Sequence, residues 1–359
     1  MVVVPQGRSR VLAEGSRLGR YIVGKRLARG GMAEVYLGTA EGTRGFAKPV
    51  ALKLILPAFA DEPSFVQMFA AEARLSAQLD HPNIAQVFDV AESEGELFMA
   101  LEYVHGRTVR AMIKEADDPV PLDVLLHIAL QTCDALAYAH TLHTAEGVVE
   151  VVHRDVSPSN LMVRYDGGVK LLDFGIAKAS SSTQATRSGM LKGKGGYMSP
   201  EQCLGLPVDA RSDLFAMGIL LFEMSTRHRL FVGDNEYDVM NRIVEGKFSR
   251  PTKLVEGYPA ALERIVVRAL QRDPDDRYAS AQAMASELRS AAAALNVVPR
   301  AEAVAEYLLD LFGPAPPLHA PTLAEPERGG TQVVVAAPPS ARDPRVGNRV
   351  AWGGLAAVA

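Results

Sequence analysis

The chain has little cysteine and no excess of positive charge. It holds only two cysteines among 359 residues, Cys133 and Cys203, which is too few for a disulfide framework and is typical of a reducing compartment. The formal net charge is −4, whereas nucleic-acid binding usually requires a basic surface. These deficits argue against a disulfide-stapled secreted domain and against a nucleic-acid partner.

Long hydrophobic runs are also missing. The N-terminus offers only Val2–Val4 before Pro5, which is too short for the apolar core of a secretory signal. The last run, Ala351–Ala359, has nine residues, whereas a membrane-spanning helix needs about 20. We therefore expect a cytoplasmic chain without a membrane span. An alternative is that Ala351–Ala359 begins a membrane segment that a longer chain would complete.

The composition is that of a globular protein, with 48% hydrophobic and 22% charged residues, and the length predicts about two domains. Strand-like runs come first, at Tyr21–Leu27, Val35–Gly38, Val50–Ile55, Ala85–Val90 and Leu97–Leu101. Helical periodicity marks Phe65–Leu75, Leu122–Leu142, Ser212–Ser225, Tyr237–Glu245, Ala260–Gln271, Ser280–Leu295 and Ala301–Phe312. This order predicts an α+β protein in which a small β-rich lobe precedes a larger helical lobe.

Composition changes sharply near the end. Eight prolines lie between Gly313 and Pro344, too many for packed elements, so a flexible tail is expected. The predicted parts are a lead-in at 1–19, a first lobe at 20–104, a second lobe at 105–295, a helical extension at 296–312 and a Pro/Ala-rich tail at 313–359.

Two motifs carry the chemistry: HRDVSPSN, from His153 to Asn160, and DFG, from Asp173 to Gly175. In this pattern one carboxylate can orient a hydroxyl nucleophile while an amide and a second carboxylate hold magnesium, as phosphoryl transfer requires. Both motifs resemble those of the eukaryotic-like (Hanks-type) protein kinases of bacteria. The resemblance implies a bilobal protein kinase fold, with Asp155 as base and Asn160 and Asp173 as metal ligands.

The same resemblance assigns a lysine and a glutamate upstream. Lys53 lies in VALK on the third strand-like run, and Glu72 lies on the helix that follows. In the family such a lysine contacts the ATP phosphates, and such a glutamate holds it by an ion pair. Burying an ammonium without a partner would be costly, which is why the pair is needed.

The glycine-rich loop departs from the family pattern. Its three glycine positions hold Ala28, Gly30 and Ala33, and Gly31 adds a further small residue. Leu101–Val104 resembles the hinge that binds adenine, with Leu101 as gatekeeper. The implied nucleotide contacts are Leu27, Gly30, Gly31, Val35, Ala51, Lys53, Glu102, Val104 and Leu161.

Residues 176–198 resemble an activation segment that ends in SPE. Thr186 and Ser188 are its candidate phosphorylation sites, with Arg154 as the phosphate-binding arginine; a solvated, hydroxyl-rich loop is the alternative. The resemblance also implies an ion pair between Glu201 and Arg277. It makes Asp213 the support of the catalytic loop backbone, for which a helix N-cap is the alternative.

Two positions depart from the serine/threonine pattern in a related way. Ser157 stands where the family usually has a lysine that neutralises the transferring phosphoryl group, and Lys194 stands at the position of a usual threonine. The cation and the hydroxyl are thus exchanged between positions expected to touch, as in myxobacterial kinases, which the chain resembles. The alternative is that Lys194 points to solvent or recognises acidic substrates.

We interpret the sequence as a serine/threonine protein kinase that uses ATP and Mg²⁺, with Mn²⁺ as an alternative metal. Its expected partners are protein substrates, and a homodimer during autophosphorylation is an open alternative. A pseudokinase scaffold and a small-molecule phosphotransferase are the rival hypotheses. His140 and His143 lack a third ligand at matching spacing, so zinc is not expected.

Overall fold

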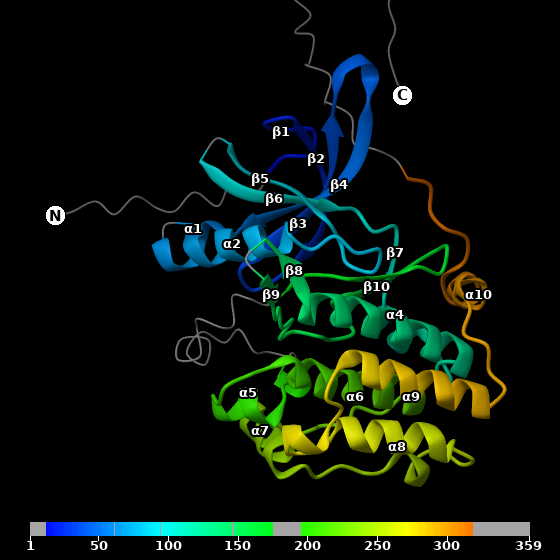
Figure 1. The fold of residues 1–359 in the computed structure, drawn as a ribbon. Coiled ribbons are helices and arrows are strands. Elements are labelled where there is room, and N and C mark those ends of the chain that lie inside the picture. Colours follow the sequence, from blue (N-terminus) through cyan, green and yellow to red (C-terminus); the bar gives the residue numbers. More distant parts are fainter. Residues whose placement is uncertain (1–11, 61, 94, 146, 175–194, 319–359) are drawn as a thin grey trace, which may run out of the picture. The chain divides into compact units, whose positions relative to one another are not determined.

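The computed structural model describes residues 12–60, 62–93, 95–145, 147–174 and 195–318. Contacts divide the chain into Met1–Ala324 and Glu325–Ala359, and every described residue belongs to the first unit. Within that unit a sheet lobe precedes a helical lobe along the chain (Figure 1). The predicted α+β architecture is therefore confirmed.

A six-stranded antiparallel sheet forms the first lobe. Its strands are β1 (Arg17–Leu18), β2 (Tyr21–Arg29), β3 (Ala33–Glu41), β4 (Ala47–Ile55), β5 (Val87–Ser93) and β6 (Glu96–Glu102), in the spatial order β1-β2-β3-β4-β6-β5. On β4, Val50, Leu52 and Leu54 are buried in the core of this lobe. Because side chains alternate along a strand, Ala51 and Lys53 lie on the opposite face.

Two helices follow β4, namely α1 (Pro57–Ala60) and α2 (Pro63–Ser76). Pro63 is the first residue of α2, where the missing N–H has no intrahelical partner to lose. Phe69 and Ala73, one turn apart, are buried in a small cluster with Met99 of β6. Glu72 lies between them in sequence and is 9% exposed, so α2 buries a carboxylate beside the sheet.

Helices make up most of the second lobe. They are α3 (Val109–Glu115), α4 (Leu122–His140), α5 (Pro200–Leu204), α6 (Ala210–Thr226), α7 (Glu236–Glu245), α8 (Ala260–Ala269), α9 (Ala281–Ala294) and α10 (Ala301–Phe312). α6 is buried at every position from Ser212 to Thr226, so it forms the centre of the lobe. The side chains of Asp209, Asn235 and Ser280 accept backbone N–H groups at the starts of α6, α7 and α9.

The helix expected over Leu122–Leu142 is shorter than predicted. α4 ends at His140, and Leu142–Thr144 instead forms β8, which pairs with β9 (Gly147–Val149) in a hairpin. Gly147 has a φ of 128°, which favours glycine at this turn. Among the described helices, α4 alone is long and apolar enough to cross a membrane, and 61% of its apolar window is buried inside the protein.

A small sheet lies where the lobes meet. Its strands are β7 (Gly106–Thr108), β10 (Leu161–Arg164) and β11 (Val169–Leu171), in the order β11-β10-β7. A Cβ atom on Gly106 would lie 2.0 Å from the carbonyl oxygen of Val163, so this close approach needs glycine. Short 3₁₀ helices complete the fold at Thr43–Gly45, Gly195–Tyr197, Pro251–Lys253 and Pro274–Asp276.

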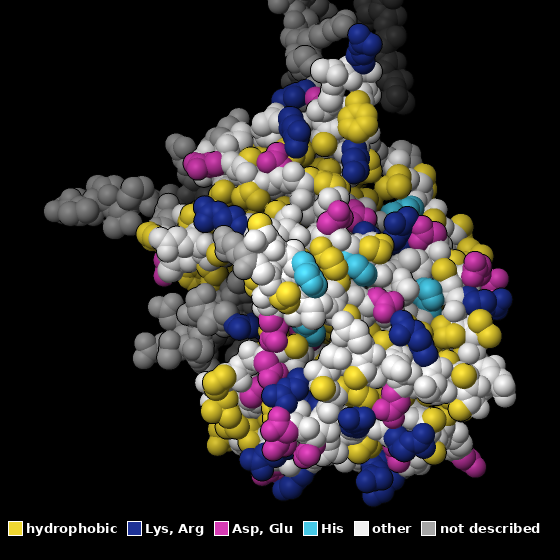
Figure 2. Space-filling view, viewed as in Figure 1, with side chains coloured by type: hydrophobic (Ala, Val, Ile, Leu, Met, Phe, Trp, Pro, Cys, Tyr) yellow, Lys and Arg dark blue, Asp and Glu magenta, His cyan; other side chains and the backbone are white. Residues whose placement is uncertain are grey.

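Charges of both signs are interspersed on the face shown in Figure 2. Surface charges form ion pairs between elements, such as Arg289 with Asp134 at 3.1 Å and Arg211 with Asp275. Exposed pairs of this kind contribute about 0–1 kcal/mol each. The buried contacts of α4 and α6, rather than surface charges, therefore account for most of the stability of the helical lobe.

Candidate active site

Three charged side chains from separate elements meet between the lobes. The Nζ atom of Lys53 lies 2.8 Å from Glu72 Oε1 and 3.0 Å from Asp173 Oδ1. Burial by itself lowers the pKa of Lys53, but the carboxylates of Asp173 and Glu72 outweigh it and raise this pKa above its usual value. Lys53 is therefore charged at neutral pH, as contact with phosphate requires.

The loop before β10 brings Asp155 and Asn160 together. The Nδ2 atom of Asn160 donates to the backbone carbonyl and to the Oδ2 atom of Asp155, both at 2.9 Å. These bonds leave Asn160 Oδ1 available as an acceptor. The backbone N–H of Leu172 donates to the Asn160 carbonyl at 2.8 Å. The segments that contain Asn160 and Asp173 therefore lie side by side.

Asp213 supports the catalytic loop from α6. This side chain is 1% exposed, and it accepts the backbone N–H groups of His153 and Arg154, both at 2.8 Å. Arg154 has a left-handed φ of 63°, a conformation that costs a non-glycine residue about 1–3 kcal/mol unless the surroundings hold it. The alternative N-cap role belongs to Asp209.

His153 joins the catalytic loop to the DFG segment. Its Nε2 atom lies 2.8 Å from the carbonyl oxygen of Leu172, and its ring lies 4.6 Å from the ring of Phe174. Burial lowers the pKa of His153, so the ring is neutral at neutral pH and donates from Nε2. The residue before Asp173 is thereby hydrogen-bonded to the HRD motif.

Glu201 and Arg277 form a buried bidentate pair. Both guanidinium nitrogens, Nη1 and Nη2, lie 2.8 Å from the carboxylate oxygens of Glu201, and Ser212 also donates to this carboxylate. Burial by itself raises the pKa of Glu201, but the bonds from Arg277 and Ser212 outweigh it and lower this pKa. The pair connects α5 with the segment between α8 and α9.

The expected nucleotide contacts on β3 and β4 share one face of the six-stranded sheet. Strand register places Val35 opposite Lys53, and Leu101 opposite Ala51; directly opposed residues share a face. Of the other expected contacts, Gly30 and Gly31 are exposed in the β2–β3 turn, Leu27 is 39% exposed, and Leu161 and Val104 are buried.

The side chain of Glu102 takes a direction that sequence reasoning did not anticipate. Its Oε2 atom lies 2.7 Å from Lys170 Nζ and accepts the backbone N–H of Gln86 at 3.3 Å. The backbone N–H of Glu102 donates to the Gln86 carbonyl at 2.8 Å, so the Glu102 carbonyl is the group expected to bind adenine, as the hinge resemblance implies.

Several expected residues lie outside the described part of the chain. These are Gly175, Thr186, Ser188 and Lys194. Ser157, the expected counterpart of Lys194, is described: it is 2% exposed, and its hydroxyl has no hydrogen-bond partner among the described residues.

Sequence reasoning missed a buried pair that joins the 3₁₀ helix Gly195–Tyr197 to α6. Tyr197 donates its hydroxyl proton to Glu223, and Arg229 Nε lies 3.3 Å from the same carboxylate. Burial raises the pKa of both Tyr197 and Glu223. The available signal was an acidic residue inside the apolar run of α6, which needs a partner when buried.

Asn160 and Asp173 fit a magnesium ion. Mg²⁺ commonly uses one or two protein oxygen ligands and completes its shell with phosphate and water. Among the described residues, no group of three or more His, Cys, Asp or Glu side chains could hold a metal. His140 and His143 bond instead to Asp213 and to the Thr141 carbonyl.

The arrangement matches a known family. The sequence pattern described as "Protein kinase domain" matches residues 21–288. The chain belongs to the protein kinase family. The resemblance drawn from the HRD and DFG motifs is thus confirmed.

Relatives of this protein kinase include bacterial enzymes. "Tyrosine-protein kinase MasK" of Myxococcus xanthus is 41% identical over 276 residues, 76% of this chain and 43% of that protein. "Serine/threonine-protein kinase PknB" of Mycobacterium leprae is 37% identical over 274 residues, 75% of this chain and 42% of that protein. The chain therefore spans less than half the length of these relatives.

A solved structure supports the fold. The crystal structure of the Mycobacterium tuberculosis PknI kinase domain matches with a TM-score of 0.59 and 27% identity, over 79% of this chain and 100% of that chain. The bilobal protein kinase fold and the similarity to a myxobacterial kinase are both confirmed.

Proposed function

We propose that this protein kinase transfers the γ-phosphoryl group of ATP to serine and threonine hydroxyls of proteins. The observation that carries the proposal is the contact of Lys53 with both Glu72 and Asp173. A pseudokinase has no need to hold a charged lysine against a metal-binding carboxylate, so this contact favours a catalytic protein over a scaffold.

Each residue then has a role in the transfer. Lys53 binds the α- and β-phosphates, and Glu72 orients it. Asp155 accepts the hydrogen bond of the substrate hydroxyl and directs that oxygen at the γ-phosphorus. Asn160 and Asp173 hold Mg²⁺, or Mn²⁺ as the alternative, which neutralises charge on the phosphate oxygens when bound.

The test uses the purified chain, labelled ATP, Mg²⁺ and a generic protein substrate, followed by phosphoamino-acid analysis. Asp155→Asn and Lys53→Met should each lower turnover by about 10²–10⁴-fold without unfolding the protein. Asp134→Asn, on α4 away from these residues, is the control. Wild-type turnover in Asp155→Asn would contradict the assigned mechanism, and label on a small molecule alone would favour the small-molecule phosphotransferase.

A second candidate is transfer to tyrosine. It rests on the name of the Myxococcus xanthus relative, a tyrosine-protein kinase with 41% identity to this chain. The departure at Ser157 from the usual serine/threonine pattern is compatible with this candidate. The phosphoamino-acid analysis separates the two, because phosphotyrosine would appear in place of, or beside, phosphoserine and phosphothreonine.

Autophosphorylation at Thr186 and Ser188 is part of the proposal. Arg154 would bind the phosphate in a charge-assisted pair, and mass spectrometry of the active protein would locate the modified residues. Phosphate found only outside 180–188 would count against these sites. The homodimer and the cytoplasmic location stay predictions.

A further inference from the structure

Helix α10 lies beyond the residues that match the kinase domain, yet it is packed into the fold. The match ends at residue 288, whereas Val304 and Leu308 of α10 are fully buried in the same core as α4. In Figure 1, α10 and the segment after it run beside the helical lobe and back toward β7. The chain thus adds an ordered element next to the connection between the lobes.

The first end of α10 contacts the turn between β10 and β11. Gly167 in this turn has a φ of 85°, and a Cβ atom there would lie 2.0 Å from the carbonyl oxygen of Ala301. The same turn touches the hinge, which we define as residues 102–105. The Tyr165 ring lies 5.0 Å from the His105 ring, and the Tyr165 N–H donates to the His105 carbonyl at 3.3 Å.

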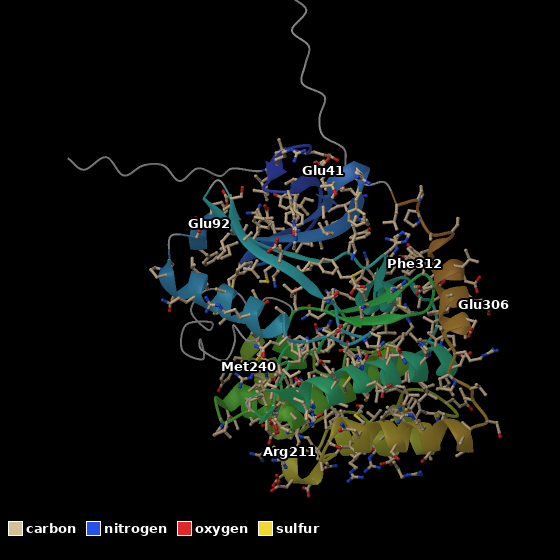
Figure 3. The ribbon with its side chains drawn as sticks, turned by 45° about the horizontal axis from the view of Figure 1, so that its top comes forward. Glu41, Glu92, Arg211, Met240, Glu306 and Phe312 are labelled. Atoms are coloured by element: carbon tan, nitrogen blue, oxygen red, sulfur yellow. The ribbon has the colours of Figure 1, made fainter. Side chains whose placement is uncertain are left out.

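The second end of α10 contacts the residues that follow the hinge. The guanidinium of Arg107, on β7, lies 4.9 Å from the centre of the Phe312 ring. Figure 3 shows Phe312 on the side of α10 that lies toward β7, and Glu306 on the other side. Arg107 also lowers the pKa of Tyr103, a shift outweighed by burial, so its charge lies close to the hinge.

The segment that follows α10 also reaches the hinge, through Leu318. A cavity of about 460 Å³ is lined by the hinge, by Arg164–Asp166 and by Leu318. The hinge therefore has the ATP-binding face on one side, as the family resemblance implies, and the segment 301–318 on the other.

We propose that residues 301–318, here named the hinge brace, position the hinge for ATP binding, with Phe312 and Arg107 as positioning residues. A hinge restrained before binding loses less conformational freedom when adenine binds, so affinity rises without a new contact to the ligand. The inference rests on the proposed function, because it assumes that ATP binds at the hinge. It places a determinant of ATP affinity outside the matched kinase domain.

The test is steady-state kinetics of the full chain with varied ATP, together with ATP titration for the dissociation constant. A cation–π contact at an exposed site changes an equilibrium by about two- to fivefold. Phe312→Ala and Arg107→Ala should each raise KM and the dissociation constant for ATP by about that factor, with kcat unchanged. Phe312→Tyr should retain wild-type values, because the ring is kept. The double variant should resemble either single variant, since one contact is lost only once.

Leu309→Ala is the matched control, because Leu309 lies on the same helix and is 52% exposed. Arg107 is also exposed, so Arg107→Ala keeps the test valid if Phe312→Ala folds poorly. Wild-type ATP affinity in both variants would overturn the brace, as would a fall in kcat at constant KM. If the wild-type chain bound no ATP, both the brace and the proposed function would be overturned. If the wild-type chain transferred phosphate but the variants kept its ATP affinity, only the brace would be overturned.

Discussion

At the scale of single residues, Ser157 combines burial with an unpartnered hydroxyl. The side chain is 2% exposed, and its Oγ atom has no hydrogen-bond partner in the described structure. A buried polar group in this state costs about 1–3 kcal/mol. We therefore expect Ser157→Ala to leave the free energy of unfolding unchanged or to raise it, as measured by urea denaturation.

Ser212→Ala is the control for this measurement. Ser212 is equally buried but donates its hydroxyl to the charged Glu201 carboxylate, so its loss should cost about 1.5–3 kcal/mol. If Ser157→Ala were destabilised by as much as Ser212→Ala, the hydroxyl of Ser157 would have a partner after all.

A second prediction at this scale concerns the exchange between Ser157 and Lys194. If Lys194 supplies the charge absent at Ser157, Lys194→Thr should slow turnover by about 10²–10³-fold, the usual effect of removing one transition-state donor. Ser157→Lys combined with Lys194→Thr should recover part of the loss, because residues in contact are non-additive. Kinetics of both single variants and of the double variant test this hypothesis. Additive effects on turnover, or unchanged turnover in Lys194→Thr, would contradict the exchange of charge between Ser157 and Lys194.

At the scale of elements, two aspartates at the start of α6 have different roles. Asp213 accepts two backbone N–H groups of the catalytic loop and faces His140 Nε2 at 2.8 Å, whereas Asp209 caps the helix. Asp213→Asn puts an N–H₂ against these donors, so it should cost about 3–5 kcal/mol and most of the activity. Asp209→Ala should cost about 1 kcal/mol. Urea denaturation measures both free energies of unfolding. Equal losses in the two variants would mean that Asp213 contributes no more than an ordinary helix cap.

The pair between Glu201 and Arg277 gives a prediction about pH. The folded-state pKa of Glu201 is lowered, so its stabilising contribution is present above the unfolded pKa and is lost as pH falls through the folded pKa. Glu201→Gln should therefore be about 3–5 kcal/mol less stable than wild type at pH 7. This difference should shrink as the pH falls below about 4.5, the unfolded value.

Urea denaturation between pH 3 and pH 7 measures this difference. Glu245→Gln serves as the control, because the Glu245 side chain is 52% exposed and should show no such trend. A difference that stays constant with pH would mean that Glu201 acts through shape rather than charge.

Long periodic elements could be predicted from the sequence, and short ones could not. Ala301–Phe312 was expected with the bounds that α10 has, because apolar residues recur there at helical spacing. The hairpin of β8 and β9 was missed, since strands of three residues show no period. Leu142 was assigned to the preceding helix for the same reason, although it begins β8.

At the scale of the whole molecule, the family resemblance predicted some of the residues that meet, but not what surrounds them. Lys53 and Glu72 pair from separate elements of the chain, as the family resemblance implies, whereas the contact of Lys53 with Asp173 was not predicted. The partner of Glu223 could not be named, because burial of Tyr197 depends on packing between segments far apart in sequence. The position of α10 behind the hinge depends on such packing too.

The folded unit extends beyond the matched kinase domain, and this gives the last prediction. The side chains of Val304 and Leu308 are 0% exposed, and loss of one such side chain costs about 2–5 kcal/mol. A chain ending at Leu295 should therefore lose at least that much free energy of unfolding relative to a chain ending at Leu318. Deletion of 319–359, and equally of 313–359, should leave kcat unchanged, because eight prolines in 313–344 are too many for packed elements.

Urea denaturation and kinetics of the three truncated chains, beside the full chain, measure these effects. Leu308→Ala in the full chain is the matched check, because it removes one buried contact of α10 while keeping every other residue. If the chain ending at Leu295 unfolded at the same urea concentration as the full chain, α10 would not belong to the folded unit. If instead only KM for ATP changed between chains ending at Phe312 and Leu318, the effect would come from the cavity that Leu318 lines behind the hinge, because both chains retain the buried face of α10.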